Sequence, residues 1–137
     1  KKFYEEKQKY DKKYNNELNK TGIFWAFSNE QFEQNKTHKN APDSEYLSIG
    51  FGGYIHKSNI DKLDYFFEVV EPKLKKDFIS KIDINDLIRY ELDNHECYYT
   101  GDYYCVVPII FDYLENYTQD EVVNLVKKVY KERSKKI

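Results

Sequence analysis

Residues 46–56 read YLSIGFGGYIH, and this stretch decides the fold class. Its first five residues alternate between larger apolar side chains and small ones, as a half-buried strand does. The glycine pair that follows supplies a turn, and the last three residues read as a second strand. The stretch therefore predicts a β-hairpin, and the short apolar run Ile23–Phe27 is expected to form a third strand beside it.

Helical patterns lie on both sides of the hairpin. Apolar residues recur at helical spacing in residues 3–20, 60–70, 84–92 and 122–130. Ser28, Ser58, Asp83 and Thr118 each stand where a helix cap is expected. Pro72 is expected to end or kink the helix that starts near Ser58. The sequence thus predicts an α+β fold, with about five or six helices around a small antiparallel sheet of roughly three strands.

We expect one domain, 1–137, with the helices at 1–20 and 119–137 at its periphery. Its core is expected to combine the apolar residues of the strands with those of the middle helices. The predicted core residues are Phe24, Trp25, Phe27, Leu47, Ile49, Ile55, Leu63, Phe66, Phe67, Leu87, Ile88 and Leu92.

Composition narrows the function classes. The net charge is −2, so the chain lacks the overall positive field that duplex-binding proteins use. No apolar run reaches the roughly 18 residues of a membrane span, and the first ten residues have no apolar signal core. Lys, Asn, Ile, Phe and Tyr are abundant, which indicates an AT-rich bacterial or phage genome. We therefore expect a cytoplasmic protein of a bacterial host cell, without a membrane partner.

Charge is concentrated in one part of the chain. Residues 83–121 hold ten acidic residues and one basic residue, Arg89, whereas both ends are basic. Tyrosines are interspersed among these acids, and tyrosine is favoured at interfaces. We expect an acidic, tyrosine-rich face that docks on a cationic partner, although the acids could instead cap helices. The predicted partner-binding residues are Asp86, Tyr90, Glu91, Asp93, Glu96, Tyr98, Tyr99, Asp102 and Tyr103.

Few residues suggest chemistry. Glu91 and His95 are four residues apart on a predicted helix, so they could share a metal that Asp102 or Cys105 completes. The favoured interpretation is structural, with His95 capping its helix beside Asp102. Cys97 is expected to be a buried structural thiol, because its neighbours are acidic. No catalytic residue, metal or cofactor is predicted.

The basic C-terminal end is a second charged feature. It comprises Lys127, Lys128, Lys131, Arg133, Lys135 and Lys136. A solvated helix end is the favoured interpretation, and contact with nucleic acid is the alternative. Direct nucleic-acid binding is therefore not expected.

Three stretches carry a resemblance: residues 22–32 (GIFWAFSNEQF), 47–55 (LSIGFGGYI) and 90–102 (YELDNHECYYTGD). Together they resemble a family of small uncharacterised proteins of phages and mobile elements. Within that background the chain is similar to an anti-CRISPR inhibitor of a type II effector. The resemblance implies a phage protein that binds the RNA-guided nuclease of its host and blocks DNA binding or cleavage.

Two alternatives stay open beside this nuclease inhibitor. The chain could be a small metal-dependent enzyme that uses Glu91, His95 and Asp102. It could also be a nucleic-acid-binding accessory protein that uses its two basic ends. Metal analysis and salt-dependent DNA binding respectively would distinguish them.

Overall fold

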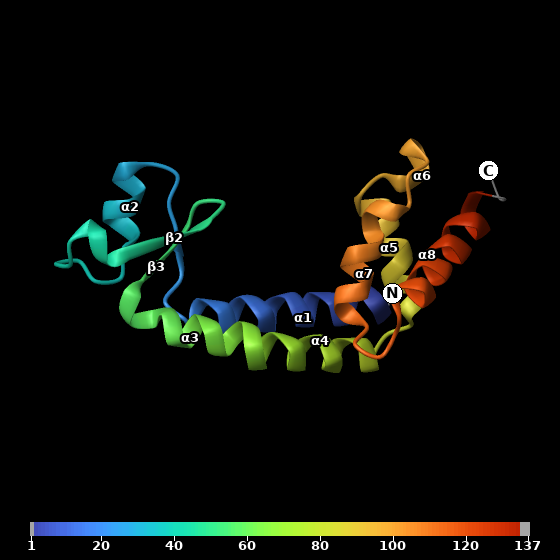
Figure 1. The fold of residues 1–137 in the computed structure, drawn as a ribbon, viewed down its shortest axis with the longest axis horizontal. Helices are drawn as coiled ribbons and strands as arrows, with labels where there is room; N and C mark the ends of the chain where they lie inside the picture. The colour runs from blue at the N-terminus through green and yellow to red at the C-terminus, as the bar shows by residue number, and fades with distance from the viewer. Residues whose placement is uncertain (1, 135–137) are drawn as a thin grey trace. The chain divides into compact units, whose positions relative to one another are not determined.

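The computed structural model describes residues 2–134, and the chain falls into two compact units (Figure 1). Unit 1 comprises Lys1–Gln8 and Lys75–Ile137, and unit 2 comprises Lys9–Leu74. Helix α1 (Lys2–Asn19) therefore begins in unit 1 and ends in unit 2. The single domain that we expected remains a prediction.

The α+β class is confirmed. The sheet lies in unit 2 and is antiparallel, with strand order β1-β3-β2. Its strands are β1 (Phe24–Trp25), β2 (Tyr46–Gly50) and β3 (Gly53–His56). β1 is shorter than the apolar run around it, because Ser28 already caps the helix that follows. Ala26 extends the pairing by one bond, since its backbone N donates to Gly52 O at 2.9 Å.

The hairpin has an irregular tip. Leu47 lies opposite Ile55, and the register shifts between Ser48 and Gly50. Gly50, Phe51 and Gly52 then have φ values of 91°, 53° and 81°. Glycine adopts this left-handed region readily, whereas a bulky residue such as phenylalanine rarely does.

Of the two helix caps predicted in unit 2, Ser28 is confirmed and Ser58 is wrong. Ser58 lies inside a short 3₁₀ helix (Lys57–Asn59) that the His56 side chain caps, and the following α-helix begins at Ile60 without a side-chain cap. Gln31 N donates to Ser28 Oγ at 3.1 Å, which starts α2.

Pro72 does not end its helix: it is the second residue of α4, where its missing N–H is tolerated, and a π-helical turn precedes it. The helical elements of unit 2 are α2 (Asn29–Asn35), α3 (Ile60–Tyr65), the π-helical turn (Phe66–Val70) and α4 (Glu71–Ser80), which continues into unit 1.

The two faces of the sheet differ. On one face Phe24 and Tyr46 pack against Phe32 of α2, with ring centroids 5.5 and 5.2 Å from that of Phe32. On the other face Ile55 is buried, but the side chains around it are exposed. The helices cover only part of a sheet with such short strands.

This uneven cover makes part of the predicted core wrong. Trp25, Phe27, Leu47 and Ile49 are exposed, because they lie on or beside the less covered face of the sheet. Phe67 is also exposed, because its neighbour Phe66 takes the buried position of the π-helical turn. The other predicted core residues are buried: Phe24, Ile55, Leu63, Phe66, Leu87, Ile88 and Leu92.

Unit 1 is helical. Asp83 caps α5, accepting from Asn85 N at 2.9 Å, and Thr118 and Glu121 form the predicted capping box before α8. Its core includes Phe3 of α1 and the valines Val122, Val126 and Val129 of α8, so both terminal helices take part in packing. The elements are α5 (Ile84–Asn94), α6 (Cys97–Thr100), the short 3₁₀ helix η4 (Tyr104–Val106), α7 (Val107–Tyr113) and α8 (Gln119–Ser134).

No helix within residues 2–134 combines the length and the apolar character that crossing a membrane requires.

Candidate protein-binding surface

The predicted partner-binding residues all lie in unit 1, on two helices and the loop after them. Asp86, Tyr90, Glu91 and Asp93 lie on α5, Glu96 precedes α6, Tyr98 and Tyr99 lie in α6, and Asp102 and Tyr103 follow it.

Four tyrosines form a continuous row of rings. Tyr98 and Tyr130 stack with their centroids 5.4 Å apart and their planes 5° apart. Tyr103 lies 5.0 Å from Tyr130 and 4.8 Å from Tyr104. Such offset ring pairs are favourable beyond the area that they bury. We call Tyr98, Tyr130, Tyr103 and Tyr104 the tyrosine stack.

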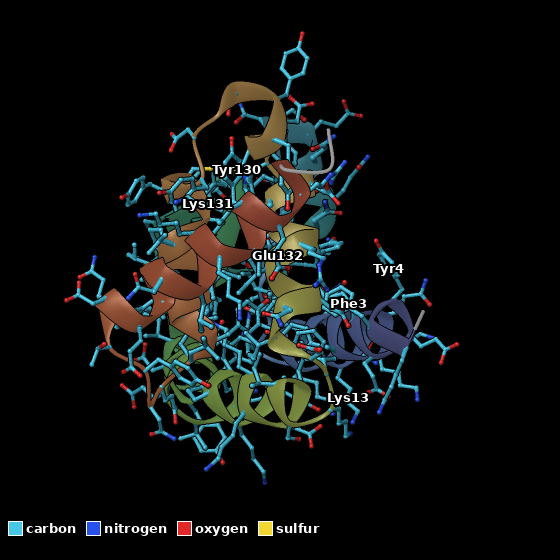
Figure 2. All side chains as sticks on the ribbon, turned by 90° about the vertical axis from the view of Figure 1, so that its right-hand side faces the viewer. Phe3, Tyr4, Lys13, Tyr130, Lys131 and Glu132 are labelled. Carbon is cyan, nitrogen blue, oxygen red and sulfur yellow. The ribbon has the colours of Figure 1, made fainter. Side chains whose placement is uncertain are left out.

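Tyr130 was missed as a site residue, because its spacing in α8 resembles that of a core position. Figure 2 shows it on α8, next to Lys131 and Glu132. Only the fold brings it between Tyr98 and Tyr103, which lie 32 and 27 residues earlier in the chain. No local pattern in the sequence could have revealed this.

An arginine ends the row. The Arg133 guanidinium lies 4.3 Å from the centroid of the Tyr98 ring and also pairs with Asp93. Cation–π contacts of this kind are favourable, most of all when partly shielded from water. Asp93 therefore lies beside the tyrosine stack, with its charge balanced by Arg133.

Other acids are also engaged. Asp86 pairs with Arg89 at 2.9 Å, and Asp112 pairs with Lys75 at 2.5 Å. The Asp102 carboxylate accepts from Tyr104 N at 3.0 Å, which shapes the loop under the stack. The alternative interpretation of these acids, as helix caps and paired surface charges, therefore accounts for several of the ten acidic residues in 83–121. Fewer carboxylates then remain for an acidic docking face.

The prediction that Glu91 is a docking residue is wrong. It is only 7% exposed, because it shares a helix face with the buried Leu87, Ile88 and Leu92. Its Oε2 lies 3.4 Å from His95 Nε2. His95 thus pairs with Glu91 and not with Asp102 as expected.

Tyr90 takes part in a different contact. Its ring centroid is 5.4 Å from Phe3 and 6.2 Å from Tyr4, and Lys7 Nζ lies 5.5 Å from it. Phe3, which Figure 2 labels on α1, is buried. Tyr90 is therefore half-buried against α1 instead of belonging to the tyrosine stack.

The most exposed residues of this region lie between Glu96 and Tyr104, in and around α6. Tyr99 is 93% exposed and Tyr104 is 59% exposed. The exposed carboxylates of Glu96 and Asp102 lie in the same segment. Glu96 has a φ of 55°, the left-handed region, where it begins α6. We define the tyrosine surface as the tyrosine stack together with Glu96, Tyr99 and Asp102.

Two phenols of this surface, those of Tyr98 and Tyr103, have a raised pKa. Burial raises the pKa of Tyr98, and the Arg133 charge opposes only part of that effect. A hydrogen bond with Tyr104 raises the pKa of Tyr103. These side chains therefore stay neutral at physiological pH and can offer their rings to a partner.

The two cysteines lie in α6 and η4, next to the tyrosines in sequence. Cys97 is buried, Cys105 is exposed, and their sulfur atoms are 2.9 Å apart. Burial raises the pKa of Cys97 to about 12, with a further contribution from Cys105. Cys97 is therefore a poor nucleophile at neutral pH.

Geometry gives the metal alternative little support. Within residues 2–134 no group of three or more His, Cys, Asp or Glu side chains is arranged to hold a metal ion. Glu91 and His95 do lie together, but the Asp102 carboxylate bonds to the Tyr104 backbone instead.

The basic end of the chain is only partly described. Lys127, Lys128 and Lys131 are exposed on α8, whereas Arg133 is engaged with Asp93 and Tyr98. Lys135 and Lys136 lie outside the described residues.

Unit 2 holds a polar cluster that sequence reasoning missed. His56 Nδ1 lies 2.8 Å from Ser58 Oγ, and its Nε2 lies 3.1 Å from Glu45 Oε1. Ser58 N also donates to Nδ1 at 3.2 Å, so the imidazole caps the short 3₁₀ helix over residues 57–59. Because His56 is almost fully buried, this serine–histidine–glutamate group is best explained as a structural cap.

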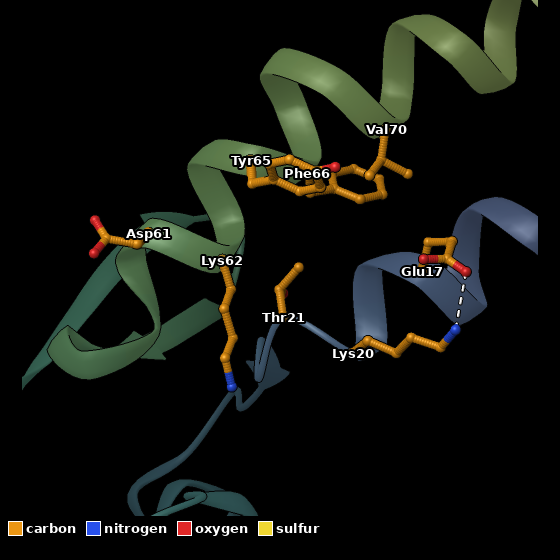
Figure 3. A pocket seen from close by; sticks show the side chains of 8 residues that line it. All are labelled: Glu17, Lys20, Thr21, Asp61, Lys62, Tyr65, Phe66 and Val70. Carbon is orange, nitrogen blue, oxygen red and sulfur yellow. Dashed lines mark hydrogen bonds and ion pairs between the residues drawn. The ribbon is translucent and has the colours of Figure 1, made fainter.

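Unit 2 also has an open groove of about 350 Å³ (Figure 3). It lies between the end of α1 and the helical run of α3 and the π-helical turn. Thr21, Phe66 and Val70 line it, and Glu17 and Lys20 form an ion pair at 2.9 Å on one side. These residues include no nucleophile–base pair and no metal ligand set.

Comparison with known proteins places the chain in a family without assigning an activity. A search of curated proteins found no match, and neither did a search of solved structures. One family matches residues 6–136, which is nearly the whole chain and includes both the tyrosine surface and the sheet. The chain therefore belongs to DUF7659, a family of unknown function.

Proposed function

We propose that the chain is a non-enzymatic binding protein that attaches stoichiometrically to a cationic protein through its tyrosine surface. The observation that carries this proposal is the stack of four tyrosines, flanked by the exposed Tyr99 and by the carboxylates of Glu96 and Asp102. Tyrosine offers a large rigid contact area together with a hydroxyl group. Carboxylates around such rings favour encounter with a positively charged partner.

The partner that we propose is the RNA-guided nuclease of a type II CRISPR system. Its channels are cationic because they hold nucleic acid, so an anionic, aromatic surface could occupy them. In this proposal the chain is a phage-encoded anti-CRISPR inhibitor that acts in the bacterial cytoplasm and blocks DNA binding or cleavage. The choice of this nuclease depends on the sequence resemblance, whereas the cationic partner depends on the surface.

A molar-ratio titration tests the proposal. The purified chain is added to the guide-loaded nuclease, and cleavage of a matched DNA is measured. Inhibition should be complete near equivalence and unaffected by a chelator added to the chain and removed before mixing, because a binder is consumed and a catalyst is not. Inhibition far below equivalence that such chelation abolishes would instead favour the metal-dependent enzyme.

Matched variants locate the surface. Tyr104→Ala should weaken binding about tenfold or more, as for an interface hot spot. Tyr65→Ala is the control, because Tyr65 of unit 2 is also 59% exposed. Equal effects of the two variants would remove the tyrosine surface from the proposal. If the nuclease does not bind but another cationic protein captured from host lysate does, with the same dependence on Tyr104, the surface stands and the nuclease is wrong.

A further inference from the structure

The less covered face of the unit 2 sheet and the hairpin tip at its end expose apolar side chains. Phe51 is 97% exposed, Phe27 is 76% exposed, and Trp25, Leu47 and Ile49 are between 40% and 47% exposed. We call these five residues the apolar sheet face. Their exposed area is roughly 600 Å², if a large side chain contributes about 150–250 Å² in full. That equals the upper end of the largest patch on a typical monomer, about 300–600 Å².

Three of these side chains lie close together, because glycines let them approach the backbone. A Cβ atom at Gly53 would lie 2.9 Å from Trp25 Cζ3 and 2.8 Å from Ile49 Cγ1. A Cβ atom at Gly52 would lie 2.4 Å from the Phe27 ring. The rings of Trp25 and Phe27 thus lie directly over glycine backbone and form one surface with Ile49.

Phe51 adds an independent observation. It projects from the hairpin tip with a φ of 53°, a strained conformation for a bulky residue. Its almost complete exposure means that packing within the chain does not compensate the strain. Strained residues that persist are typical of sites that bind something.

Charge indicates what covers this face. The three strands contain no Asp, Glu, Lys or Arg, so two copies of the face can meet without like-charge repulsion. The nearby side chains of Gln31 and Asn35 are neutral amides that bond to the backbone of Phe27 and Trp25. Residues 9–74 hold nine lysines and ten acids, so the basic surround that would favour an anionic lipid surface is missing.

We propose that the apolar sheet face is an interface with a second copy of the chain. The two sheets pack face to face, and the Phe51 side chain of each copy is covered by the other. A standard interface buries about 800 Å² per partner, so an apolar patch of roughly 600 Å² with its rim is of the required size. Homodimer interfaces are also more apolar than transient ones, which suits this composition. This inference does not depend on the proposed function.

Sedimentation equilibrium of the full chain, from about 1 to 300 µM, tests the dimer, because a dimer gains population with concentration. We expect twice the monomer mass at the upper end. Trp25 is the only tryptophan and lies in the interface, so its emission should shift to the red on dilution, and acrylamide should quench it more strongly. A chain that stays monomeric throughout this range would overturn the proposal.

Variants separate the face from the rest of unit 2. Phe51→Lys, at an almost fully exposed position, should raise the dimer dissociation constant at least about tenfold. The double variant Phe51→Lys and Ile49→Lys should abolish the dimer. Val69→Lys is the control, since Val69 is exposed on the π-helical turn. Circular dichroism checks that each variant is folded. A dimer that survives Phe51→Lys, or that Val69→Lys weakens equally, would place the interface elsewhere. Monomers that bind neutral lipid vesicles through Phe51 would replace the second copy with a membrane.

Discussion

The tyrosine surface of unit 1 and the apolar sheet face of unit 2 both expose aromatic rings, but they are built differently. In the tyrosine surface the rings stack on one another, and Arg133 and Asp93 hold one end of the row. In the apolar sheet face the side chains are Trp, Phe, Leu and Ile, and the strands carry no charge. The tyrosine surface carries hydroxyl groups and charges that water can solvate, whereas the apolar sheet face exposes mostly hydrocarbon.

This difference indicates two kinds of binding. A surface of tyrosines and carboxylates can stay hydrated until a partner arrives, so it suits an association that forms and dissociates. A surface of phenylalanine, tryptophan and aliphatic side chains gains most from lasting cover, because burial of apolar area is its only driving force. We therefore expect the cationic partner on unit 1 and the second copy on unit 2.

The largest expected effect tests which aromatic residues are core and which are surface. Phe66 is 1% exposed and packs edge-to-face on Tyr14, with centroids 5.2 Å apart, whereas Phe67 is 46% exposed. Phe66→Ala should lower the free energy of unfolding by about 3–5 kcal/mol, and Phe67→Ala by less than about 1 kcal/mol. Urea denaturation of both variants measures this. Similar losses of stability in the two variants would show that the π-helical turn does not bury Phe66 while exposing Phe67.

The next prediction concerns the independence of the two surfaces. Tyr99→Ala combined with Tyr104→Ala should reduce affinity for the cationic partner by about 2 kcal/mol or more, while the dimer dissociation constant stays unchanged. Phe51→Lys should raise the dimer dissociation constant and leave the affinity for the cationic partner unchanged. Titration calorimetry with the partner and sedimentation of the chain alone give the two constants. Coupled losses in either variant would mean that the two surfaces form one site.

Much of the fold was predictable because its signals are local. The hairpin, the Ser28 cap, the Asp83 cap and the Thr118 capping box each depend on residues within a few positions of one another. The apolar faces of α5 and α8 follow from helical spacing alone. Burial of Leu87, Ile88 and Leu92 was correct for the same reason.

Burial at the sheet was not predictable, because alternation shows that a strand has two faces but not which face is covered. Leu47 and Ile49 satisfy the strand pattern and are nevertheless exposed. The tyrosine stack was predictable only in part: Tyr98 and Tyr103 lie close together in the sequence, but Tyr130 and Arg133 come from a distant helix. Glu91 was misplaced because an acid on the core-facing side of a helix contradicts the usual pattern.

Alkaline pH should lower the stability of the protein through the buried thiol of Cys97 in α6. Burial raises the pKa of the Cys97 thiol from its ordinary value of 9.0 to about 12 in the folded chain. Its contribution to stability is therefore complete below pH 9.0 and is lost as pH rises toward 12. The loss is at most about 1.4 kcal/mol per pH unit, since above pH 9 the unfolded chain releases a proton that the folded chain keeps.

Denaturation between pH 7 and 11, with a reducing agent present, measures this loss. Cys97→Ala should flatten the profile above pH 9, whereas Cys105→Ser, at the exposed partner, should change it less. Both cysteines belong to unit 1, so the profile reports on the unit that carries the tyrosine surface. Identical profiles for the wild type and Cys97→Ala would contradict the buried thiol.

The smallest expected effect concerns backbone strain, which both surfaces contain. Phe51 in unit 2 has a φ of 53°, and Glu96 in unit 1 has a φ of 55°. A left-handed residue with a Cβ atom is disfavoured by about 1–2 kcal/mol, and glycine regains part of this at an entropic cost of about 0.5–1 kcal/mol. Phe51→Gly and Glu96→Gly should therefore each be more stable than the matching alanine variant, by up to about 1 kcal/mol.

The alanine variants are the essential controls, because alanine removes the same side chain but keeps the strained Cβ atom. Thermal melts at low protein concentration, where the dimer is dissociated, give the comparison. Phe51→Gly should nevertheless dimerise as poorly as Phe51→Ala, since both lack the ring that the second copy covers. If glycine and alanine are equally stable at position 51 but not at position 96, the hairpin tip relaxes in solution. Phe51 would then reach its interface by adapting to the partner copy instead of being held ready for it.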